Sequence, residues 1–217
     1  MTPDLFDAPE LRQRWAEPLA PGAVVLRGFA LDDEAALLSM LDGVIAAGPL
    51  RHMVTPGGLE MSVAMTNCGR LGWVSDRRGY RYDERDPLSG LAWPALPAVF
   101  LDVASRAAFS AGFERFVPDA CLVNQYEPGT RLSLHQDRNE RDFAAPIVSI
   151  SLGLPAVFLF GGDERSDKAA RVPLAHGDVV VWGGASRLRY HGVLPLKDGV
   201  HRLLGRRRIN ITLRLAG

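Results

Sequence analysis

The chain has 217 residues, 47% of them hydrophobic and 23% charged, a composition that fits one globular domain and excludes a disordered or fibrous protein. Lysine and arginine together number 25, as do aspartate and glutamate. The resulting net charge of zero excludes a protein that binds nucleic acid through a strongly basic overall field. Cys68 and Cys121 are too few for a disulfide framework and lack the spacing of a zinc site, so both are expected in the core.

The N-terminal residues carry acids and arginines without the apolar segment of a signal peptide. The longest apolar stretch, residues 147–160, is too short and too interrupted to span a bilayer. The sequence also contains no repeat, low-complexity tract or interdomain linker. We therefore expect a single domain over residues 1–217 that is monomeric, cytoplasmic and without membrane contact.

Residues 1–119 are expected to form an N-terminal extension with two helices. A strand over residues 23–27 is followed by a helix over about residues 32–47, for which an aspartate is the candidate N-cap. Residues 94–112 are predicted to form the second helix, because proline stands at its start and glycine at its end.

The segment between the helices, about residues 51–93, is rich in glycine, proline, arginine and aromatic residues. It contains one good strand candidate, residues 61–66, and long irregular segments of this kind tend to be lids or binding loops. Within it, residues 77–82 interleave arginines with tyrosines that can stack on bases. A solvated loop is the simpler explanation of that pattern, as it is for the second basic cluster at residues 206–208.

The last hundred residues follow a different pattern, in which short apolar or alternating runs are separated by glycine and proline turns. Eight strands are predicted there, over residues 121–126, 132–136, 147–152, 156–160, 171–174, 178–182, 188–191 and 208–215. Such a series favours a jelly roll or barrel, with the two helices packed outside one sheet. The predicted fold class is therefore mainly β with flanking helices, in the broad α+β group.

The run His135-Gln136-Asp137 is the sharpest local feature of the chain. Side chains two residues apart on a strand point to the same face, so His135 and Asp137 offer an imidazole and a carboxylate together. With His191 from another predicted strand they form the two-histidine, one-carboxylate triad of iron(II) oxygenases, which leaves positions open for a cosubstrate and O2. The pattern alone is weak, because a chain with five histidines can show it by chance.

The last predicted strand alternates strictly between polar and aliphatic residues. Its polar face carries Arg208, Asn210, Thr212 and Arg214, two guanidiniums without a carboxylate. A solvated strand is one explanation, but a solvent face more often mixes charge signs. The same face inside a barrel would bind a dicarboxylate through forked, charge-assisted hydrogen bonds. Another predicted strand, residues 121–126, places the polar side chains of Asn124 and Tyr126 on one face.

The sequence resembles the bacterial AlkB family over nearly the whole chain. The matching stretches are MVTPGG at residues 53–58, MSVAMTNCG at 61–69, PDACLVNQY at 118–126, LSLHQD at 132–137, APIVSISLGLPAVFLFGG at 145–162 and HGDVVVWGG at 176–184. Together they are far more specific than any single motif. The resemblance implies a double-stranded β-helix, or jelly roll, as a catalytic core over residues 120–217, and a nucleotide-recognition lid at about residues 51–93.

The resemblance also implies roles for individual positions. The iron(II) ligands would be His135, Asp137 and His191. The residues that would hold 2-oxoglutarate are Asn124, Tyr126, Arg208, Asn210 and Arg214. The residues that would contact the substrate are Thr55, Met61, Trp73, Tyr80, Asn139 and Arg165.

Within the substrate group, the resemblance implies that Trp73 stacks on a flipped base opposite His135 and that Tyr80 touches the nucleic-acid backbone. Thr55 and Met61 are weaker candidates for the same pocket. Packing of Trp73 into the core and a plain surface charge at Arg165 are the alternatives.

Asn139 departs from the family pattern, because the best-known bacterial member carries a second aspartate at this position, two residues beyond the aspartate of the HxD run. A carboxylate there would favour cationic bases, whereas an amide keeps the hydrogen bond without the charge. We therefore expect weaker discrimination in favour of cationic lesions, unless Glu140 or Asp142 swings in to restore the charge.

The implied function is an iron(II)- and 2-oxoglutarate-dependent dioxygenase that removes alkyl groups from damaged bases, such as 1-methyladenine, 3-methylcytosine and etheno adducts. DNA, single- or double-stranded, is the expected substrate, with RNA as a further one. One alternative is a 2-oxoglutarate oxygenase that acts on RNA or on a protein side chain. Another is a catalytically silent jelly-roll binding protein, which would need a filled metal coordination sphere or would lack the arginine pair.

Overall fold

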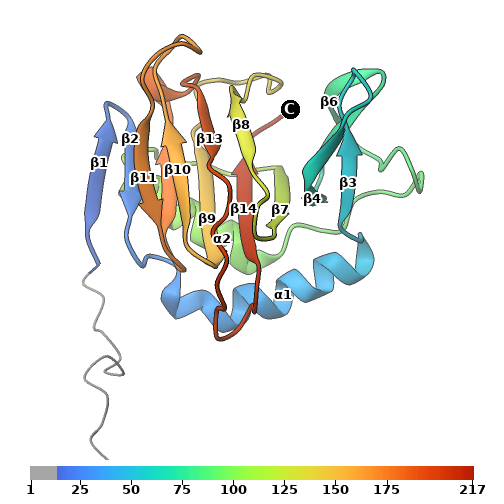
Figure 1. Ribbon diagram of the computed structural model, residues 1–217, viewed down its shortest axis with the longest axis horizontal. Coiled ribbons are helices and arrows are strands. Elements are labelled where there is room, and N and C mark those ends of the chain that lie inside the picture. The colour runs from blue at the N-terminus through green and yellow to red at the C-terminus, as the bar shows by residue number, and fades with distance from the viewer. Residues whose placement is uncertain (1–13) are drawn as a thin grey trace, which may run out of the picture.

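The computed structural model describes residues 14–217, and its strands build two facing sheets and a separate hairpin (Figure 1). The larger sheet has the strand order β1 (Ala16–Ala20), β2 (Ala23–Leu26), β12 (Val179–Trp182), β9 (Ile147–Gly153), β14 (Arg208–Arg214), β7 (Ala120–Tyr126), β4 (Glu60–Gly69) and β3 (Arg51–Val54). The smaller sheet has the order β11 (Ala170–Leu174), β10 (Ala156–Phe160), β13 (His191–Val193) and β8 (Leu132–His135). This arrangement is the predicted jelly roll with flanking helices.

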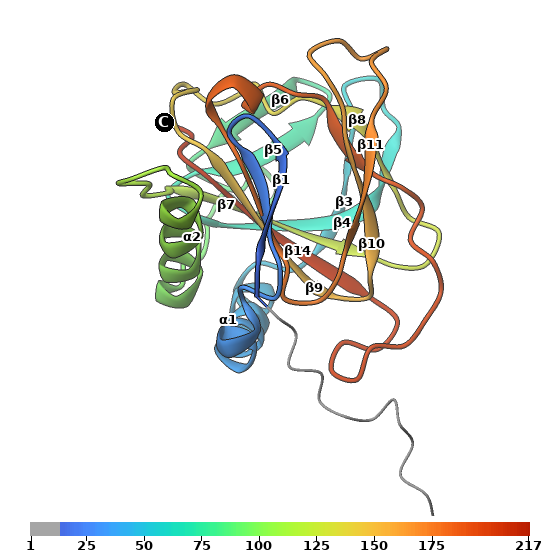
Figure 2. The ribbon, with the colours of Figure 1, turned by 90° about the vertical axis from the view of Figure 1, so that its left-hand side faces the viewer.

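Two helices cover one face of the larger sheet, as Figure 2 shows from the side. They are α1 (Glu34–Ala47) and α2 (Ala98–Ser110). The aliphatic residues of β14, namely Ile209, Ile211 and Leu213, share one buried cluster with the helices. Since side chains alternate along a strand, the polar residues of β14 must face the other way, toward the smaller sheet.

A second hydrophobic cluster fills the space between the two sheets. It combines Tyr126 and Trp182 of the larger sheet with Phe158 and Val193 of the smaller one. Every residue of β14 is buried, so its polar face lies inside the barrel and is not solvated. Cys68 and Cys121 are both buried free thiols, as expected.

The helix boundaries correct the sequence prediction in two places. The first helix begins at Glu34 after a short 3-10 turn, and Asp33 stands at its N-cap without a capping hydrogen bond from its side chain. The Asp33 carboxylate accepts a hydrogen bond from Arg106 instead, at 2.8 Å. The second helix begins only at Ala98, because Pro97 precedes it in an extended conformation.

Two strand predictions were also wrong. Residues 188–190 are not part of a strand, because the chain is still leaving a 3-10 turn at Gly184–Ser186, and β13 begins only at His191. The segment over residues 51–93 is not largely irregular, since it also contains β3 and the hairpin of β5 (Gly72–Asp76) and β6 (Gly79–Asp83). These strands carry polar and aromatic residues in place of regular apolar alternation, so their pattern is hard to recognise.

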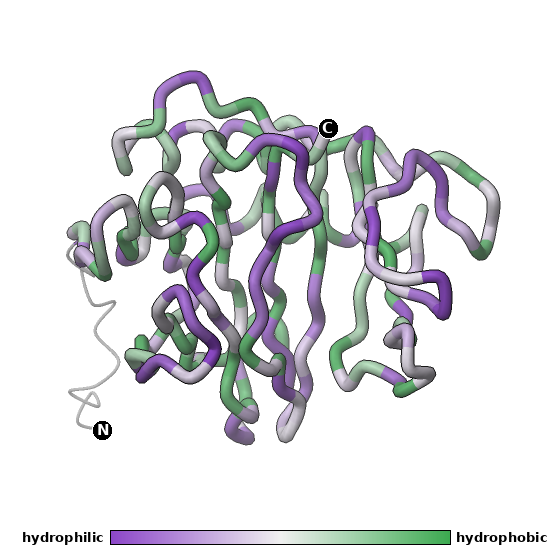
Figure 3. The backbone as a smooth tube through the Cα atoms, turned by 90° about the horizontal axis from the view of Figure 1, so that it is seen from above, coloured by the Kyte–Doolittle hydropathy of each residue, from purple (hydrophilic) through white to green (hydrophobic). Residues whose placement is uncertain are grey.

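The hairpin β5–β6 lies at one side of the barrel (Figure 1). The molecule seen from above in Figure 3 shows hydrophilic stretches at the bends of the chain on this side. Gly72 lets the hairpin pack closely on Trp93, because a Cβ atom at this position would lie 2.3 Å from the indole ring.

No helix within residues 14–217 is long and apolar enough to cross a bilayer.

Candidate metal centre

His135 and His191 lie opposite one another on neighbouring antiparallel strands. His135 is the last residue of β8, His191 is the first of β13, and the two are direct partners in the strand register. Their ring centroids are 4.4 Å apart. Gly192 permits this close pairing, since a Cβ atom there would approach the carbonyl oxygen of Leu132 to 2.7 Å.

Backbone carbonyls orient both imidazoles. The Nδ1 atom of His135 lies 2.9 Å from the carbonyl oxygen of Ser133, and that of His191 lies 3.0 Å from the carbonyl oxygen of Arg189. A carbonyl only accepts hydrogen bonds, so each Nδ1 carries the proton and donates. Each Nε2 is left with a free lone pair, as a metal ligand requires.

Asp137 lies just beyond the end of β8, and not on the strand as the sequence pattern suggested. Its Oδ1 is 3.7 Å from Nε2 of His135, and its Oδ2 is 3.8 Å from Nε2 of His191. One ligand atom from each of the three residues lies within 4.8 Å of the other two. Two imidazoles and one carboxylate so close together are the donor set of a non-haem iron(II) site, so these side chains fit that metal.

The electrostatic environment keeps these groups in metal-binding protonation states. Burial alone would raise the pKa of Asp137, but the positive charge of Arg214, the largest opposing influence, holds this pKa well below its usual range. Burial, followed by the influence of His135, lowers the pKa of His191 to about 4. At neutral pH the triad therefore offers an ionised carboxylate and a neutral buried imidazole.

Arg208 is a buried guanidinium with unused donors. Its Nη2 donates to Ser151 Oγ at 2.9 Å, whereas Nε and Nη1 have no hydrogen-bond partner among the described residues. The Tyr126 ring packs 5.0 Å from the guanidinium, and the buried Tyr126 hydroxyl also lacks a partner within residues 14–217. Burial raises the pKa of Tyr126, although the charge of Arg208 opposes this. Because a buried donor without an acceptor is costly, the pair fits a carboxylate such as that of 2-oxoglutarate.

The other expected cosubstrate residues are placed differently. Arg214 lies on the same face of β14, but its Nε and Nη2 both donate to Asp137 Oδ2, at 2.8 Å and 2.5 Å. Asn210 uses its amide within the sheet, where it donates to Ser149 Oγ and accepts from Thr212. Asn124 is buried opposite Asn210 in the register of β7 and β14.

The two aromatic residues of the lid stack on one another. The rings of Trp73 on β5 and Tyr80 on β6 are 5.7 Å apart and nearly parallel, at 15°. Tyr80 is 46% exposed, whereas Trp73 is half-buried against the cluster between the sheets. Trp73 Nε1 donates to Asn139 Oδ1 at 3.4 Å, so the stacked pair lies beside the loop that carries Asp137.

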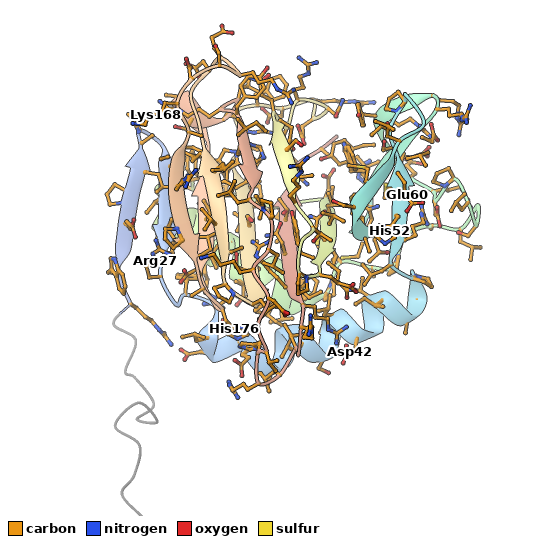
Figure 4. All side chains as sticks on the ribbon, viewed as in Figure 1. Arg27, Asp42, His52, Glu60, Lys168 and His176 are labelled. Carbon is orange, nitrogen blue, oxygen red and sulfur yellow. The ribbon has the colours of Figure 1, made fainter. Side chains whose placement is uncertain are left out.

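Of the three remaining substrate candidates, Thr55 and Met61 belong to the β3–β4 hairpin, whereas Arg165 lies elsewhere, between β10 and β11. Met61 is half-buried and packs against the same cluster as Trp73. Thr55 shapes the turn between β3 and β4, because its hydroxyl accepts a hydrogen bond from the Leu59 amide at 3.1 Å. Arg165 is exposed in the loop between β10 and β11, the loop that also carries Lys168 (Figure 4).

The other histidines lie away from this end of the barrel. Figure 4 shows His52 on β3 and His176 close to α1. His176 accepts a hydrogen bond from the Gly153 amide at Nδ1 and contacts Glu34 through Nε2 at 2.6 Å, and its ring stacks on His201. His52 contacts the Met61 carbonyl through Nδ1. Among the described residues, the group that could hold a metal ion contains none of these three histidines.

Sequence reasoning overlooked Trp182, Arg187 and Tyr82 around the triad, and it considered Glu140 only as a substitute carboxylate beside the substrate. Trp182 lies 5.0 Å from the His191 ring, and its indole nitrogen has no partner within the described chain. Glu140, Arg187 and Tyr82 form a buried polar network behind Asp137. The only available signal was the position of Glu140 three residues after Asp137, since Arg187 and Tyr82 are far away in the chain.

Two facing antiparallel sheets with this triad at one end define the class of iron(II)- and 2-oxoglutarate-dependent oxygenases. Residues 22–214 match the model of the 2OG-Fe(II) oxygenase superfamily. The alpha-ketoglutarate-dependent dioxygenase AlkB of Salmonella typhimurium is 59% identical over 202 residues, which cover 93% of this chain and 94% of that protein. The protein of the same name from Escherichia coli is 56% identical, over 94% of each chain.

A solved structure described as that of OsALKBH1 matches with a TM-score of 0.81 and 30% identity, over 92% of this chain and 99% of that one. The chain belongs to the 2OG-Fe(II) oxygenase superfamily and, within it, to the AlkB family of dioxygenases. It is therefore an enzyme that depends on iron(II) and 2-oxoglutarate.

Proposed function

We propose that this dioxygenase removes alkyl groups from damaged bases in DNA, of the 1-methyladenine, 3-methylcytosine and etheno types. The observation that carries the proposal is the stacked pair of Trp73 and Tyr80 beside the loop of Asp137. An exposed aromatic surface next to a metal centre suits the face of an unpaired base. The similarity to the AlkB dioxygenases supports the same substrate class.

The residues of the triad would bind iron(II) through the two Nε2 atoms and the Asp137 carboxylate. When bound together with 2-oxoglutarate and O2, the metal supplies the oxidant that hydroxylates the alkyl carbon, and aldehyde, succinate and CO2 are released. The unused donors of Arg208 would hold one carboxylate of the cosubstrate. Asn124, Tyr126, Asn210 and Arg214 would surround it.

The lid would select the base. An alkyl group inside a base stack cannot reach a metal at the end of the barrel, so the nucleotide must be extruded or already unpaired. Trp73 would stack on that base and Tyr80 would touch the backbone, while Asn139 would face the base edge. Thr55, Met61 and Arg165 would complete the surroundings. Because all these residues come from one chain, we propose that a monomer suffices.

An assay of aldehyde and succinate release tests the proposal, in which the methylated bases should release formaldehyde and the etheno adduct a two-carbon dialdehyde. The substrates are oligonucleotides of one sequence that carry 3-methylcytosine, 1-methyladenine or ethenoadenine, each prepared as DNA and as RNA. Release that requires the lesion, iron(II) and 2-oxoglutarate together is the expected result. Release from a methylated peptide but from none of the oligonucleotides would favour a protein-directed oxygenase and would overturn the proposal.

A further inference from the structure

A buried polar network connects the lid hairpin with the aspartate of the metal centre. Its centre is Glu140, whose side chain is only 2% exposed. Neither the triad nor the expected cosubstrate pocket accounts for this glutamate, and a buried carboxylate is costly unless it is paired. Its partners therefore indicate what it does.

Glu140 is shared between two arginines and one tyrosine. Its Oε1 accepts a hydrogen bond from the Tyr82 hydroxyl at 2.7 Å and lies 3.4 Å from Arg214 Nε. Its Oε2 lies 3.2 Å from Arg187 Nη2. Burial raises the pKa of Tyr82 well above its usual value, so the hydroxyl keeps its proton and remains a donor.

Both arginines in turn hold Asp137. Arg214 donates from two nitrogens to Oδ2 of Asp137, at 2.5 Å and 2.8 Å, and Arg187 Nη1 donates to the main-chain carbonyl of Asp137 at 2.8 Å. Asp137 lies beyond the end of β8, where no strand pairing fixes it. Its side chain and its backbone are therefore positioned by two guanidiniums whose common counter-ion is Glu140.

The other end of the network lies in the lid. Tyr82 of β6 is the direct cross-strand partner of Trp73 in β5, and Trp73 stacks on Tyr80. The hydroxyl of Tyr82 thus links the hairpin that carries the aromatic pair to Glu140, and through the arginines to Asp137. A displacement of the hairpin would remove one hydrogen bond from the carboxylate that balances both arginines.

We propose that Glu140 is a positioning residue for the metal centre and that Tyr82 couples the position of the lid hairpin to it. The coupling is reciprocal, as linkage requires: metal binding stabilises the hairpin in the position where Tyr82 bonds to Glu140, and the hairpin in this position strengthens metal binding. The identification of the hairpin as a nucleotide lid rests on the proposed function, whereas the link to Asp137 does not.

The direct test measures Mn(II) affinity in the presence of 2-oxoglutarate and without nucleic acid, by isothermal titration calorimetry. Glu140→Gln keeps the size of the side chain but leaves Arg187 and Arg214 with one buried anion fewer. Since groups that orient metal ligands are typically worth about 10–100-fold in metal affinity, we expect a loss in that range. The matched control is Glu84→Gln, a glutamate 76% exposed next to the hairpin, which should leave Mn(II) affinity unchanged.

A milder variant keeps the test decisive if Glu140→Gln does not fold. Tyr82→Phe removes one hydroxyl and should weaken Mn(II) by roughly threefold to tenfold, the range expected for one hydrogen bond. Ser110→Ala, which also removes one hydroxyl and its hydrogen bond, to the Arg106 carbonyl on α2, is the control and should leave Mn(II) affinity unchanged. Amide hydrogen exchange of residues 72–83 provides the second readout: Mn(II) and 2-oxoglutarate should increase protection in the wild type and do so less in Tyr82→Phe.

If all folded variants bind Mn(II) with an affinity within twofold of that of the wild type, the proposed role of Glu140 is wrong. A protection gain that is equal in Tyr82→Phe and the wild type would overturn the coupling. Failure of the oligonucleotide assay with these binding results intact would reject only the proposed function. Loss of dealkylation in Glu140→Gln with normal Mn(II) affinity would reject only the positioning role.

Discussion

Arg208 and Trp73, which we expect to bind the two different reactants, lie in opposite surroundings. Arg208 is fully buried on β14, a strand paired along its length with β7 on one side and β9 on the other. Trp73 is half-buried on a hairpin of two strands that pair only with each other. The histidines, although on short strands, are likewise fixed by direct cross-strand pairing and by carbonyls two residues away.

This contrast separates the two tasks of the enzyme. Metal and cosubstrate need donors fixed within a fraction of an ångström, which paired and buried strands provide. Substrates that differ in shape need a surface that can adjust, which a two-stranded hairpin with a half-buried Trp73 and an exposed Tyr80 provides. Substitutions in the barrel should therefore affect metal or 2-oxoglutarate, and substitutions of the lid side chains that face the substrate should affect nucleic acid. Tyr82 is the expected exception, because its hydroxyl links the lid to Glu140 and so to the metal centre. Each of the following experiments can contradict this division of tasks or make it more specific.

The largest effect is expected from the barrel side, at Asp137. Asp137→Ala removes the only carboxylate of the triad and leaves Arg214 without its main partner, so succinate formation should be abolished. Asp142→Ala, the same change in an exposed aspartate five residues away, should retain turnover. Near-normal succinate production by Asp137→Ala would show that the triad has been wrongly assigned.

Arg208→Ala should cause the next largest effect and should be specific for the cosubstrate. A buried carboxylate that loses its guanidinium is weakened by about 2–5 kcal/mol, measured as the dissociation constant of 2-oxoglutarate with Mn(II) present. Arg207→Ala, the exposed neighbour, is the control. Arg214→Ala should also weaken 2-oxoglutarate more than nucleic acid. Because Arg214 holds Asp137, it should lower Mn(II) affinity as well, whereas Arg208→Ala should not.

Trp73→Ala tests the lid side. Loss of one base-stacking surface should cost about 1–3 kcal/mol of affinity for a methylated oligonucleotide, without a comparable change for 2-oxoglutarate. Trp15→Ala, at an exposed tryptophan beside β1, is the control for a general effect of removing an indole. If Trp73→Ala weakened both ligands equally, the division between barrel and lid would not hold.

The same contrast explains what the sequence predicted well. The strand pattern located β7, β9, β10 and β14 almost to the residue, because a buried strand has to carry apolar or alternating residues over its whole length. The polar face of β14 was correctly expected inside the barrel, because two arginines without a carboxylate are unusual on a solvated face.

The sequence predicted the lid and the network poorly for physical reasons. In the hairpin β5–β6, both faces mix polar side chains with aromatic or aliphatic ones, so no regular apolar period marks the strands. β13 was placed three residues early, because Leu188 and Tyr190 imitate a strand although they follow a 3-10 turn. Glu140 and Arg187 are 47 residues apart and meet only through tertiary packing, which no local pattern encodes.

The family pattern has a carboxylate at the position of Asn139, and two nearby acids, Glu140 and Asp142, could have replaced it. The structure places neither acid where it could do so. Glu140 is buried between Arg187 and Arg214, so it is not available to a substrate. Asp142 accepts a hydrogen bond from the Ala144 amide, two residues further along its own loop. The amide of Asn139, exposed and in contact with Trp73, is therefore the group that should face the base.

The smallest effect is expected from Asn139→Asp, and it refines the lid side of the comparison. Bases methylated at adenine nitrogen 1 or cytosine nitrogen 3 are cations, so a carboxylate should favour them over neutral etheno adducts. A hydrogen bond with a charged partner exceeds a neutral one by on the order of 1 kcal/mol, up to about a tenfold change in specificity. We expect the ratio of kcat/KM for 3-methylcytosine to that for ethenoadenine, in one oligonucleotide sequence, to rise by up to this factor. Asn139→Ser, which adds no charge, should not raise the ratio, and an unchanged ratio in Asn139→Asp would reject the electrostatic argument.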